Sequence, residues 1–486
     1  MTVVVTDRSD FSLDNVRRVA FDGEHVDFSK TALRRMQSAH EAFQRYVEAN
    51  RDLFIYGVTT LGGAEAKNQR TPEEALRIRR ATRRPRLSFA REELPQHALR
   101  ATVFATLIQF VEGNTATHPG RAQAVADMLK QPMPRVPAQG VTVPGEILAM
   151  AHLYQGVAQP EEAGYQVGSG NGSQFTNGLS AVSAIQSRRR LELAARLFAL
   201  AAEAFNVPLE EYDPALKRFW GDRYEAEAID VLNEHLRGAR RTGRRPYEAP
   251  VSFGVLPRLL GQAFRAVAAL EEVSEISLRA ISSNPSYSLP DKRHPLGRTF
   301  SNAGYHNAIC PPALDNVAAS WVDLAQLAHR YTSKLHKGEV SLLPDRLYRP
   351  DEAPEVRAST LGLAYVPNGY IEEMRLLAQP SLLSSAEPGA DDQDDMSAPG
   401  FLAYTKLDRV SELFDMTLAV LAASTSQALH VTRRPAPPPL RGFLRSIRTT
   451  FPPIVATRDL GEDADALAAR FGQATMTGDV ALRMTV

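Results

Sequence analysis

Tyr56 stands in the segment IYGVTT, residues 55–60, and carries a phenol that can act as a general base. A tyrosinate is a strong base, but the ordinary phenol pKa of about 10 leaves the group protonated at neutral pH. A site that uses this base must favour the anion through nearby positive charge or hydrogen bonds. A second tyrosine, Tyr247, can donate or orient a proton. The structural alternatives are a loop–helix junction for Tyr56, and packing beside Pro246 and Pro250 for Tyr247.

Other kinds of active site have little support in the sequence. Metal spacings of the H-E-x-x-H or C-x-x-C kind, the G-x-S-x-G segment and the G-x-x-x-x-G-K-[ST] phosphate loop do not occur. The arginine-rich stretch 70–91 would by itself indicate phosphate or nucleic-acid binding. Aromatic residues are sparse in it, however, and Glu73, Glu74, Glu92 and Glu93 flank it. We therefore interpret this stretch as a solvated helix face.

Several segments resemble those of the histidine and phenylalanine ammonia-lyase family, whose signature loop matches IYGVTT. The others are GVTVPGEILAMAH (140–152), GNGSQFTNGLSA (170–181), EISLRAISSNP (275–285), SNAGYHNA (301–308) and DDQDDMSA (391–398). The resemblance implies a mainly α fold, an ammonia-lyase (fumarase/aspartase-like) bundle of long helices with a small N-terminal β-containing region. It also implies a homotetramer in which three subunits complete each pocket around a small-molecule substrate.

The resemblance assigns roles to three polar side chains. The family counterpart of Tyr56 removes the β-proton of the substrate, and that of Asn171 contacts the cofactor carbonyl and the substrate. Tyr247 keeps its position in the family pattern. Without the cofactor, Asn171 would hold a polar group of the substrate or cap the helix that follows it.

Further candidates lie where the family binds the departing amine. Gln393 and Asp394 take the place of the family's Gln-Glu, and an acidic group there would stabilise a cationic leaving group. The aspartate run at 391–395 is also typical of a solvated loop. His306 matches a family histidine that is more often structural, and we keep it as a candidate substrate contact.

The family builds its electrophile, a methylidene-imidazolone (MIO), from an internal Ala-Ser-Gly. Alignment of residues 140–152 places Val143-Pro144-Gly145 on that triad. The chemistry needs a serine that loses water and a following glycine nitrogen that closes the ring, whereas Pro144 has neither a hydroxyl nor a backbone N–H. Thr142 is the nearest hydroxyl, but Val143 follows it. We expect no MIO and no other cofactor, with Val143 and Gly145 contacting the substrate.

The carboxylate site of the family is altered as well. Pro250 stands where the family has the arginine that pairs with the substrate carboxylate, and Gly304 replaces an asparagine. An arginine from 70–91, or Arg244 or Arg245, is a candidate replacement, because a guanidinium can bind a carboxylate with two parallel hydrogen bonds. Losses focused on the cofactor and carboxylate sites indicate a changed function.

Length and composition limit the partners of this protein. The chain has 486 residues, which is enough for a large core and more than one structural region. Its 56 basic and 56 acidic residues balance, so nucleic acid and an anionic membrane are poor partners. The lone Cys310 fits a reducing compartment. The sequence shows neither a secretion signal nor an apolar run of about 18 residues. We expect a soluble cytoplasmic protein.

Helical periodicity dominates the chain. Apolar residues recur at three- and four-residue steps in residues 187–205, and the stretches 255–281 and 403–429 show the same pattern. Strand patterns are limited to short runs at 2–6 and 26–28. The periodicity itself therefore predicts a mainly α protein, in which other helices or other subunits bury the apolar faces.

Breaks in the pattern divide the chain into three predicted domains. The stretch 384–400 is rich in Ser, Gly, Pro and Asp and is expected to be a loop, and the prolines after Ala436 end the last long helix. We expect an N-terminal domain at 1–205 with the tyrosine loop and the altered MIO segment. A central long-helix bundle at 206–435 and a C-terminal appendage at 436–486 follow.

Three functions are compatible with these residues. The first is an MIO-independent lyase that expels a leaving group needing no covalent activation, such as a quaternary amine; ergothionase is a branch of the family that lacks the electrophile. The second is another proton-transfer reaction on a biosynthetic intermediate, such as a dehydration, cyclisation or addition. The third is a non-catalytic binding homologue. An open pocket with Tyr56 facing a polar partner would favour the first two.

Overall fold

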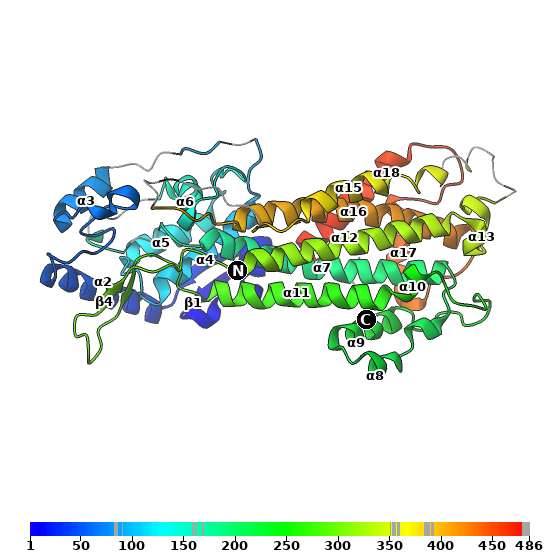
Figure 1. Ribbon diagram of the computed structural model, residues 1–486, viewed down its shortest axis with the longest axis horizontal. Helices are drawn as coiled ribbons and strands as arrows, with labels where there is room; N and C mark the ends of the chain where they lie inside the picture. The colour runs from blue at the N-terminus through cyan, green and yellow to red at the C-terminus, as the bar shows by residue number, and fades with distance from the viewer. Residues whose placement is uncertain are drawn as a thin grey trace. The chain divides into compact units, whose positions relative to one another are not determined.

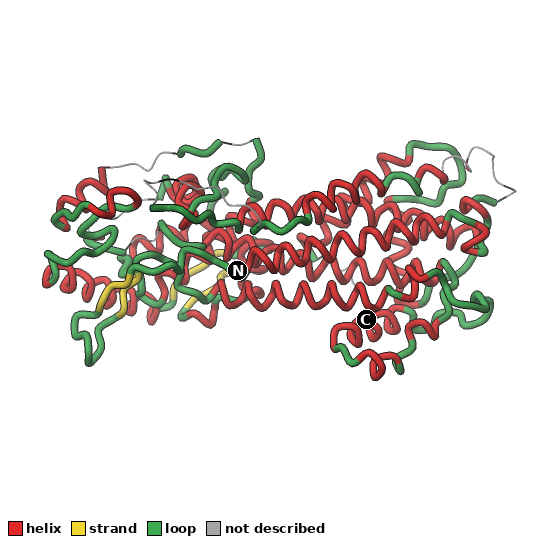
Figure 2. The backbone as a smooth tube through the Cα atoms, in the orientation of Figure 1, coloured by secondary structure: helices red, strands yellow, loops and turns green. Residues whose placement is uncertain are grey.

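Helix is the dominant secondary structure of the chain (Figures 1 and 2), so the predicted mainly α fold is confirmed. The computed structural model describes residues 1–486 apart from 82–85, 90, 158–159, 161–162, 168–169, 350, 352–355, 357–359, 383–388, 390–392 and 479–486. Residues 384–388 and 390–392 of the predicted loop at 384–400, with Asp391 and Asp392 of the aspartate run, therefore lie outside the described residues.

Four long helices carry much of the core. They are α7 (Gln174–Ala204), α11 (Leu256–Leu278), α12 (Cys310–Leu335) and α16 (Gly400–Val431). The periodic stretches in the sequence lie within or close to α7, α11 and α16, which confirms those three helices. The predicted apolar stripe of α7 is buried along its whole length; its members are Leu191, Ala194, Ala195, Phe198 and Ala202.

Aromatic side chains join these helices. Phe198 of α7 meets Tyr331 of α12 edge to face, with ring centroids 5.4 Å apart. Trp321 of α12 stacks on Phe414 of α16 at 5.3 Å. Because such rings bury large apolar areas, they supply much of the stabilisation that holds long helices side by side.

Shorter helices complete the described chain. They are α1 (Leu13–Val16), α2 (Lys30–Ala49), α3 (Pro72–Ala81), α4 (Gln96–Val111), α5 (Pro119–Asp127), α6 (Ile147–Tyr154), α8 (Leu216–Trp220), α9 (Arg223–His235), α10 (Val251–Gly254), α13 (Gly338–Ser341), α15 (Pro367–Leu377), α17 (Arg441–Thr450) and α18 (Leu460–Thr477). The N–H of Glu74 donates to Thr71 Oγ1 at 3.2 Å, so threonine caps α3.

Strands are few and short. Strands β1 (Thr2–Val5) and β2 (His25–Phe28) lie at the two short runs that the sequence predicted. They pair in parallel, with Val3 opposite Val26. The antiparallel pair β3 (Ser286–Ser288) and β4 (Arg298–Phe300) was not predicted. Three-residue strands carry too little alternation to be recognised in a sequence.

By their internal contacts, the residues form two compact units. The first unit consists of Met1–Ala184, Leu270–Leu314 and Pro380–Thr405, and the second of Ile185–Ala269, Asp315–Gln379 and Lys406–Val486. Each of the four long helices contributes residues to both units. The three consecutive domains expected at 1–205, 206–435 and 436–486 were defined by breaks in the sequence pattern, whereas these units are defined by contacts. The three domains therefore stay a prediction.

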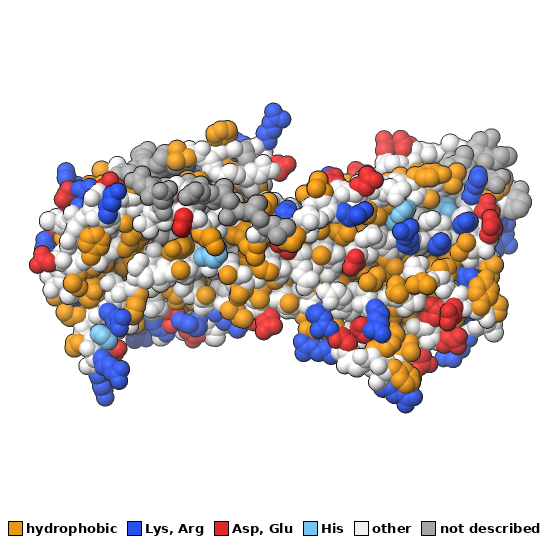
Figure 3. All heavy atoms as spheres, in the orientation of Figure 1, with side chains coloured by type: hydrophobic (Ala, Val, Ile, Leu, Met, Phe, Trp, Pro, Cys, Tyr) orange, Lys and Arg blue, Asp and Glu red, His pale blue; other side chains and the backbone are white. Residues whose placement is uncertain are grey.

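The distribution of charged side chains on the surface agrees with the equal numbers of basic and acidic residues in the sequence. On the face shown in Figure 3, both basic and acidic side chains are spread over the surface. None of the described helices combines the length and the apolar character needed to cross a membrane.

Candidate active site

The segment that replaces the family triad folds into a tight turn against the start of α7. Pro144–Glu146 form one short 3-10 turn, in which Gly145 adopts a left-handed backbone with φ of 65°. A Cβ atom at this position would lie 1.8 Å from Asn171 Oδ1, so only glycine fits. The N–H of Gly172 also donates to the Gly145 carbonyl at 3.1 Å. The structure thus brings Gly145 and Asn171 into contact, with Val143 half-buried beside them.

Glu146, which the sequence analysis did not single out, anchors this turn. Its carboxylate is buried and accepts hydrogen bonds from Phe175 N at 2.6 Å, Thr176 N at 2.9 Å and Thr176 Oγ1 at 2.5 Å. A negative charge is favoured at a helix N-terminus, where backbone N–H groups lack partners. Burial nevertheless raises the pKa of Glu146 to about 7, although these hydrogen bonds lower it. The sequence feature that could have identified Glu146 is that it is the one carboxylate in residues 140–152.

The start of α16 packs against the same place. A Cβ atom on Gly400 would lie 1.9 Å from Thr176 Oγ1, so the two backbones approach closely. We call the group Gly145, Glu146, Asn171, Thr176 and Gly400 the turn–α7 junction. Its members come from three separate stretches of the chain, all within the first unit.

Tyr56 lies half-buried in the turn region that follows α2. Its hydroxyl accepts a hydrogen bond from Gly63 N at 3.3 Å. Burial of Ile55 and Val58 anchors this loop in the core, and Thr59 Oγ1 accepts a hydrogen bond from Ile55 N at 2.7 Å. Among the described residues, no hydrogen bond connects Tyr56 with the turn–α7 junction, so the structure does not join the predicted base to Asn171.

An arginine from the arginine-rich stretch supports the tyrosine loop. Arg79 of α3 donates to the carbonyl of Gly57, next to Tyr56, and to the carbonyl of Gln166 at 3.4 Å. Arg70 forms ion pairs with Glu65 at 3.0 Å and Glu74 at 3.1 Å. The prediction of a purely solvated face is therefore wrong for Arg79, because a contact made 22 residues away cannot be read from the local pattern.

Among the described residues, the side chain of His306 makes no hydrogen bond with the other candidates. Its backbone N–H donates to the Ala303 carbonyl at 3.0 Å in a turn. The neighbouring Asn307 is the connected residue. Its Oδ1 accepts from Cys310 N at 3.0 Å and caps α12, and its Nδ2 donates to Asn177 Oδ1 on α7 at 2.9 Å. An asparagine shortly before a Pro-Pro helix start was the signal that could have identified it.

Gln393 is exposed and Asp394 is half-buried. The N–H of Asp394 donates to the Gly389 carbonyl at 3.2 Å, which forms an isolated bridge. Burial raises the pKa of Asp394, and the neighbouring charge of Asp395 raises it further. Within the described part of the chain, the side chains of this pair are not hydrogen-bonded to Tyr56 or to Asn171.

Tyr247 belongs to the second unit and is 55% exposed. The Arg245 guanidinium lies 4.7 Å from the centre of its ring and 4.9 Å from the ring of Phe205. Arg245 is itself buried, with its Nε and Nη1 atoms lacking hydrogen-bond partners among the described residues. Arg245 therefore packs beneath the ring of Tyr247. Because its guanidinium does not reach solvent, it is not placed to bind the carboxylate of an entering substrate.

Arg244 is committed to a buried ion pair. Its guanidinium pairs with Glu203 at 2.5 Å, and Arg434 pairs with the same carboxylate at 2.6 Å. We correct the expectation that Arg244 could bind a substrate carboxylate, because its guanidinium is buried and already paired with the buried carboxylate of Glu203. Among the described residues, no group of three or more His, Cys, Asp or Glu side chains could hold a metal ion.

The sequence matches the model of the aromatic amino acid lyases over residues 11–170 and 160–449. This chain belongs to that family. As an aromatic amino acid lyase family member, it is 25% identical over 488 residues to the histidine ammonia-lyase of Symbiobacterium thermophilum, covering 94% of each chain. It is 24% identical over 515 residues to the tyrosine ammonia-lyase of Cereibacter sphaeroides, covering 95% of this chain and 96% of the relative.

Solved structures agree on the fold of this family member. The tyrosine aminomutase of Streptomyces globisporus superposes with a TM-score of 0.84 at 18% identity, covering 98% of both chains. The ergothionase of Treponema denticola, an ergothioneine-degrading enzyme, superposes with a TM-score of 0.83 at 16% identity, covering 98% of this chain and 99% of that one. The expected ammonia-lyase fold is confirmed, and family and relatives together indicate a lyase-like enzyme.

Proposed function

We propose that this protein is a lyase that eliminates an activated leaving group from a small substrate without an MIO cofactor. The observation that carries the proposal is the turn at Val143-Pro144-Gly145. Its backbone still packs against Asn171, as an intact site would require, while its residues lack the groups from which the electrophile is made.

The residues present do not fit the cofactor. The nitrogen of Gly145 is available to close the ring, but the C=N bond and the methylidene group need an N–H hydrogen and a hydroxyl at position 144, and Pro144 has neither. Gly145 is also held in a left-handed conformation, with Asn171 Oδ1 at the place where a Cβ atom would lie. We therefore derive no step through an MIO group and assign the whole reaction to ordinary side chains.

In the proposed reaction Tyr56, as the phenolate, removes a proton from the carbon β to the leaving group. The electron pair of that C–H bond forms a C=C bond, and the C–N bond breaks with its electrons moving to nitrogen. A quaternary ammonium then leaves as a neutral tertiary amine, so no covalent activation is needed. Arg79 donates to the Gly57 carbonyl and so holds the backbone that carries Tyr56.

Gln393 and Asp394 are assigned to the leaving-group end of the pocket. A carboxylate stabilises the cationic amine of the bound substrate and not the neutral product, which assists release. Asn171 holds a polar group of the substrate above the turn, with Val143 and Gly145 forming the floor, and His306 is kept as a further contact. Pro250 in place of an arginine argues against tight binding of an α-carboxylate.

A homotetramer completes this proposal. Tyr247 is exposed in the single chain and lies in the unit that does not contain Tyr56. A second copy would bring Tyr247 to the pocket as proton donor or orienting group. Sedimentation of the full chain at micromolar concentration tests the assembly, and a monomer would contradict it.

A substrate panel tests the reaction class. Histidine, phenylalanine and tyrosine would be compared with their trimethylammonium betaines, following both the new C=C absorbance and amine release. We expect activity with betaines only. Ammonia release from a plain amino acid would contradict the proposal, and silence across the panel would favour a different proton-transfer reaction or a binding function.

The intact mass tests the cofactor assignment separately. We expect the mass of the unmodified sequence. A deficit of two waters, located in a peptide that contains Val143-Pro144-Gly145, would show that an MIO-type ring forms after all.

A further inference from the structure

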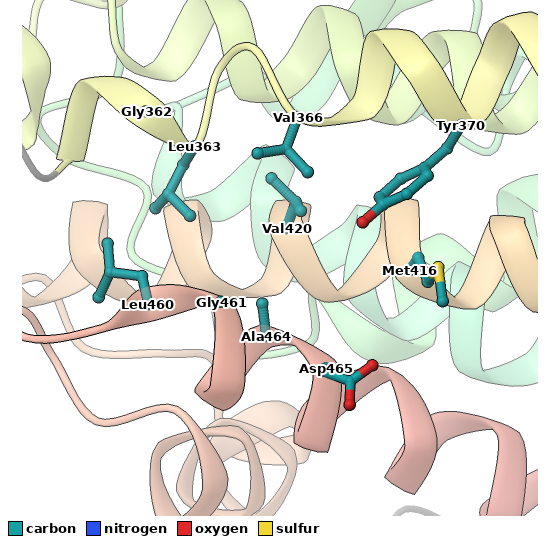
Figure 4. Close-up of a pocket in the computed structure, with 10 residues that line it drawn as sticks. All are labelled: Gly362, Leu363, Val366, Tyr370, Met416, Val420, Leu460, Gly461, Ala464 and Asp465. Carbon is teal, nitrogen blue, oxygen red and sulfur yellow. The ribbon is translucent and has the colours of Figure 1, made fainter.

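A cavity of about 300 Å³ lies in the second unit among α15, α16 and α18 (Figure 4). It is lined by Gly362, Leu363, Val366, Tyr370, Met416, Val420, Leu460, Gly461, Ala464 and Asp465. Cavities of this size with apolar walls and a few polar groups are typical of small-molecule sites. None of the candidate active-site residues takes part in it.

The cavity has an apolar end and a polar end. Leu363 and Leu460 form one end, and Val366 faces Val420 in the middle (Figure 4). At the other end the hydroxyl of Tyr370 extends from α15 toward α16, and the carboxylate of Asp465 projects from α18. A ligand that fills the cavity would therefore place an apolar body at one end and a polar group at the other.

The polar end is available and negatively charged. Neither Asp465 nor Tyr370 has a hydrogen-bond or ion-pair partner among the described residues, and the same holds for Glu462, one turn earlier on α18. The nearby Asp463 is neutralised by Arg458 at 2.8 Å. The exposed Asp465 carboxylate attracts a cation and repels an anion, so an ammonium group placed beside it is favoured over a hydroxyl or a carboxylate.

We propose that this cavity is a second binding site, for a small organic cation with an apolar body. The ammonium group pairs with Asp465 and donates to the Tyr370 hydroxyl, and the hydrocarbon part lies against Leu363, Val366 and Val420. Each methylene group that leaves water for the apolar wall strengthens binding, so a short alkyl chain suffices for weak, measurable binding.

Three isosteric probes test the charge preference on the full chain: hexylammonium, 1-hexanol and hexanoate. Their aliphatic bodies differ from the aromatic side chains on which relatives act, so binding in the lyase pocket is less favoured. Calorimetry or ligand-observed NMR should rank hexylammonium first and hexanoate last. Equal affinity for the three probes would overturn the proposal.

Two variants locate the site. Asp465→Asn should weaken hexylammonium binding about threefold, the scale of an exposed ion pair, and leave 1-hexanol binding unchanged. Ala464→Trp should fill the cavity and abolish binding of both. Glu462→Gln is the matched control, because it removes a carboxylate from the same helix that does not line the cavity. Hexylammonium binding that survives Ala464→Trp overturns the proposal.

The sedimentation coefficient of each variant shows whether a second copy of the protein, and not a small cation, fills the cavity. If Ala464→Trp folds normally but changes the assembly state, and no probe binds the parent chain, the cavity receives a second copy of the protein and the proposal fails. Asp465→Asn should not change turnover in the proposed lyase reaction. The test of the cavity is therefore independent of the test of the lyase reaction.

Discussion

Asn171 Oδ1 occupies the space that any side chain at position 145 would need. The oxygen lies 1.8 Å from the ideal Cβ position of Gly145, and the Gly145 carbonyl accepts the N–H of Gly172 at 3.1 Å. Shape and hydrogen bonding therefore both hold the altered turn on the start of α7. The segment 143–145, which we align with the family's Ala-Ser-Gly, is thus fixed in a single turn against residues 171–172.

Gly145→Ala should destabilise the protein more than an ordinary left-handed glycine replacement. Gly140→Ala is the matched control, since Gly140 has φ of 70° but nothing within 4 Å of a built Cβ. The control carries only backbone strain, about 1 kcal/mol, while Gly145→Ala adds displacement of Asn171. Urea unfolding measures both variants. Equal free energies of unfolding for the two variants would contradict the contact, and Asn171→Ala should partly rescue Gly145→Ala.

Glu146 should make stability depend on pH in a defined direction. Its pKa is raised from 4.5 to about 7 by burial, so between these values the folded state holds a proton that the unfolded state has lost. The free energy of unfolding therefore falls as the pH rises through this window, by at most about 3 kcal/mol. Urea unfolding at about pH 5 and about pH 7 measures the fall.

Glu146→Gln removes this titration and should show a smaller fall over the same window. The variant is also less stable at every pH, because a carboxamide nitrogen replaces one acceptor of the N–H groups of Phe175 and Thr176. Glu192→Gln, at an exposed position of α7, serves as the control and should titrate like the parent. A parent-like slope for Glu146→Gln would contradict the assignment.

Arg79→Ala should loosen the tyrosine loop without unfolding the protein. A hydrogen bond from a charged donor to a carbonyl contributes about 1.5–3 kcal/mol, so amide exchange around Gly57 should accelerate about tenfold. Arg77→Ala is the control, because Arg77 is exposed on the same helix. Hydrogen-exchange mass spectrometry of peptides covering 55–60 makes the comparison, and unchanged exchange would remove Arg79 from the support of this loop.

Tyr56→Phe should lower turnover at least about 100-fold on any substrate of the panel that reacts, the scale of one general base. The hydroxyl makes one 3.3 Å hydrogen bond with Gly63 N, so its loss should change the melting temperature little. Tyr224→Phe, in the second unit, is the control. Retained turnover in Tyr56→Phe would assign the proton transfer to another group.

Much of this protein follows from its sequence, for physical reasons that act locally. Apolar spacing located α7, α11 and α16, because a helix must bury one face wherever it packs. The family segments identified the fold over most of the chain. Pro144 has no hydroxyl and no backbone N–H, and this follows from its covalent structure alone. β3 and β4 were missed because three residues show no period.

Only the tertiary structure decided how the candidate site is held together. Glu146 meets Thr176 across 30 residues, and Arg79 meets Gly57 across 22, and neither pair shares a local pattern. The same folding buried Arg244 against Glu203, 41 residues away, and left Tyr247 exposed. Residue types set what chemistry each side chain can do. Which of them are close enough, and how far burial shifts their protonation, depends on contacts that form only when distant stretches pack together.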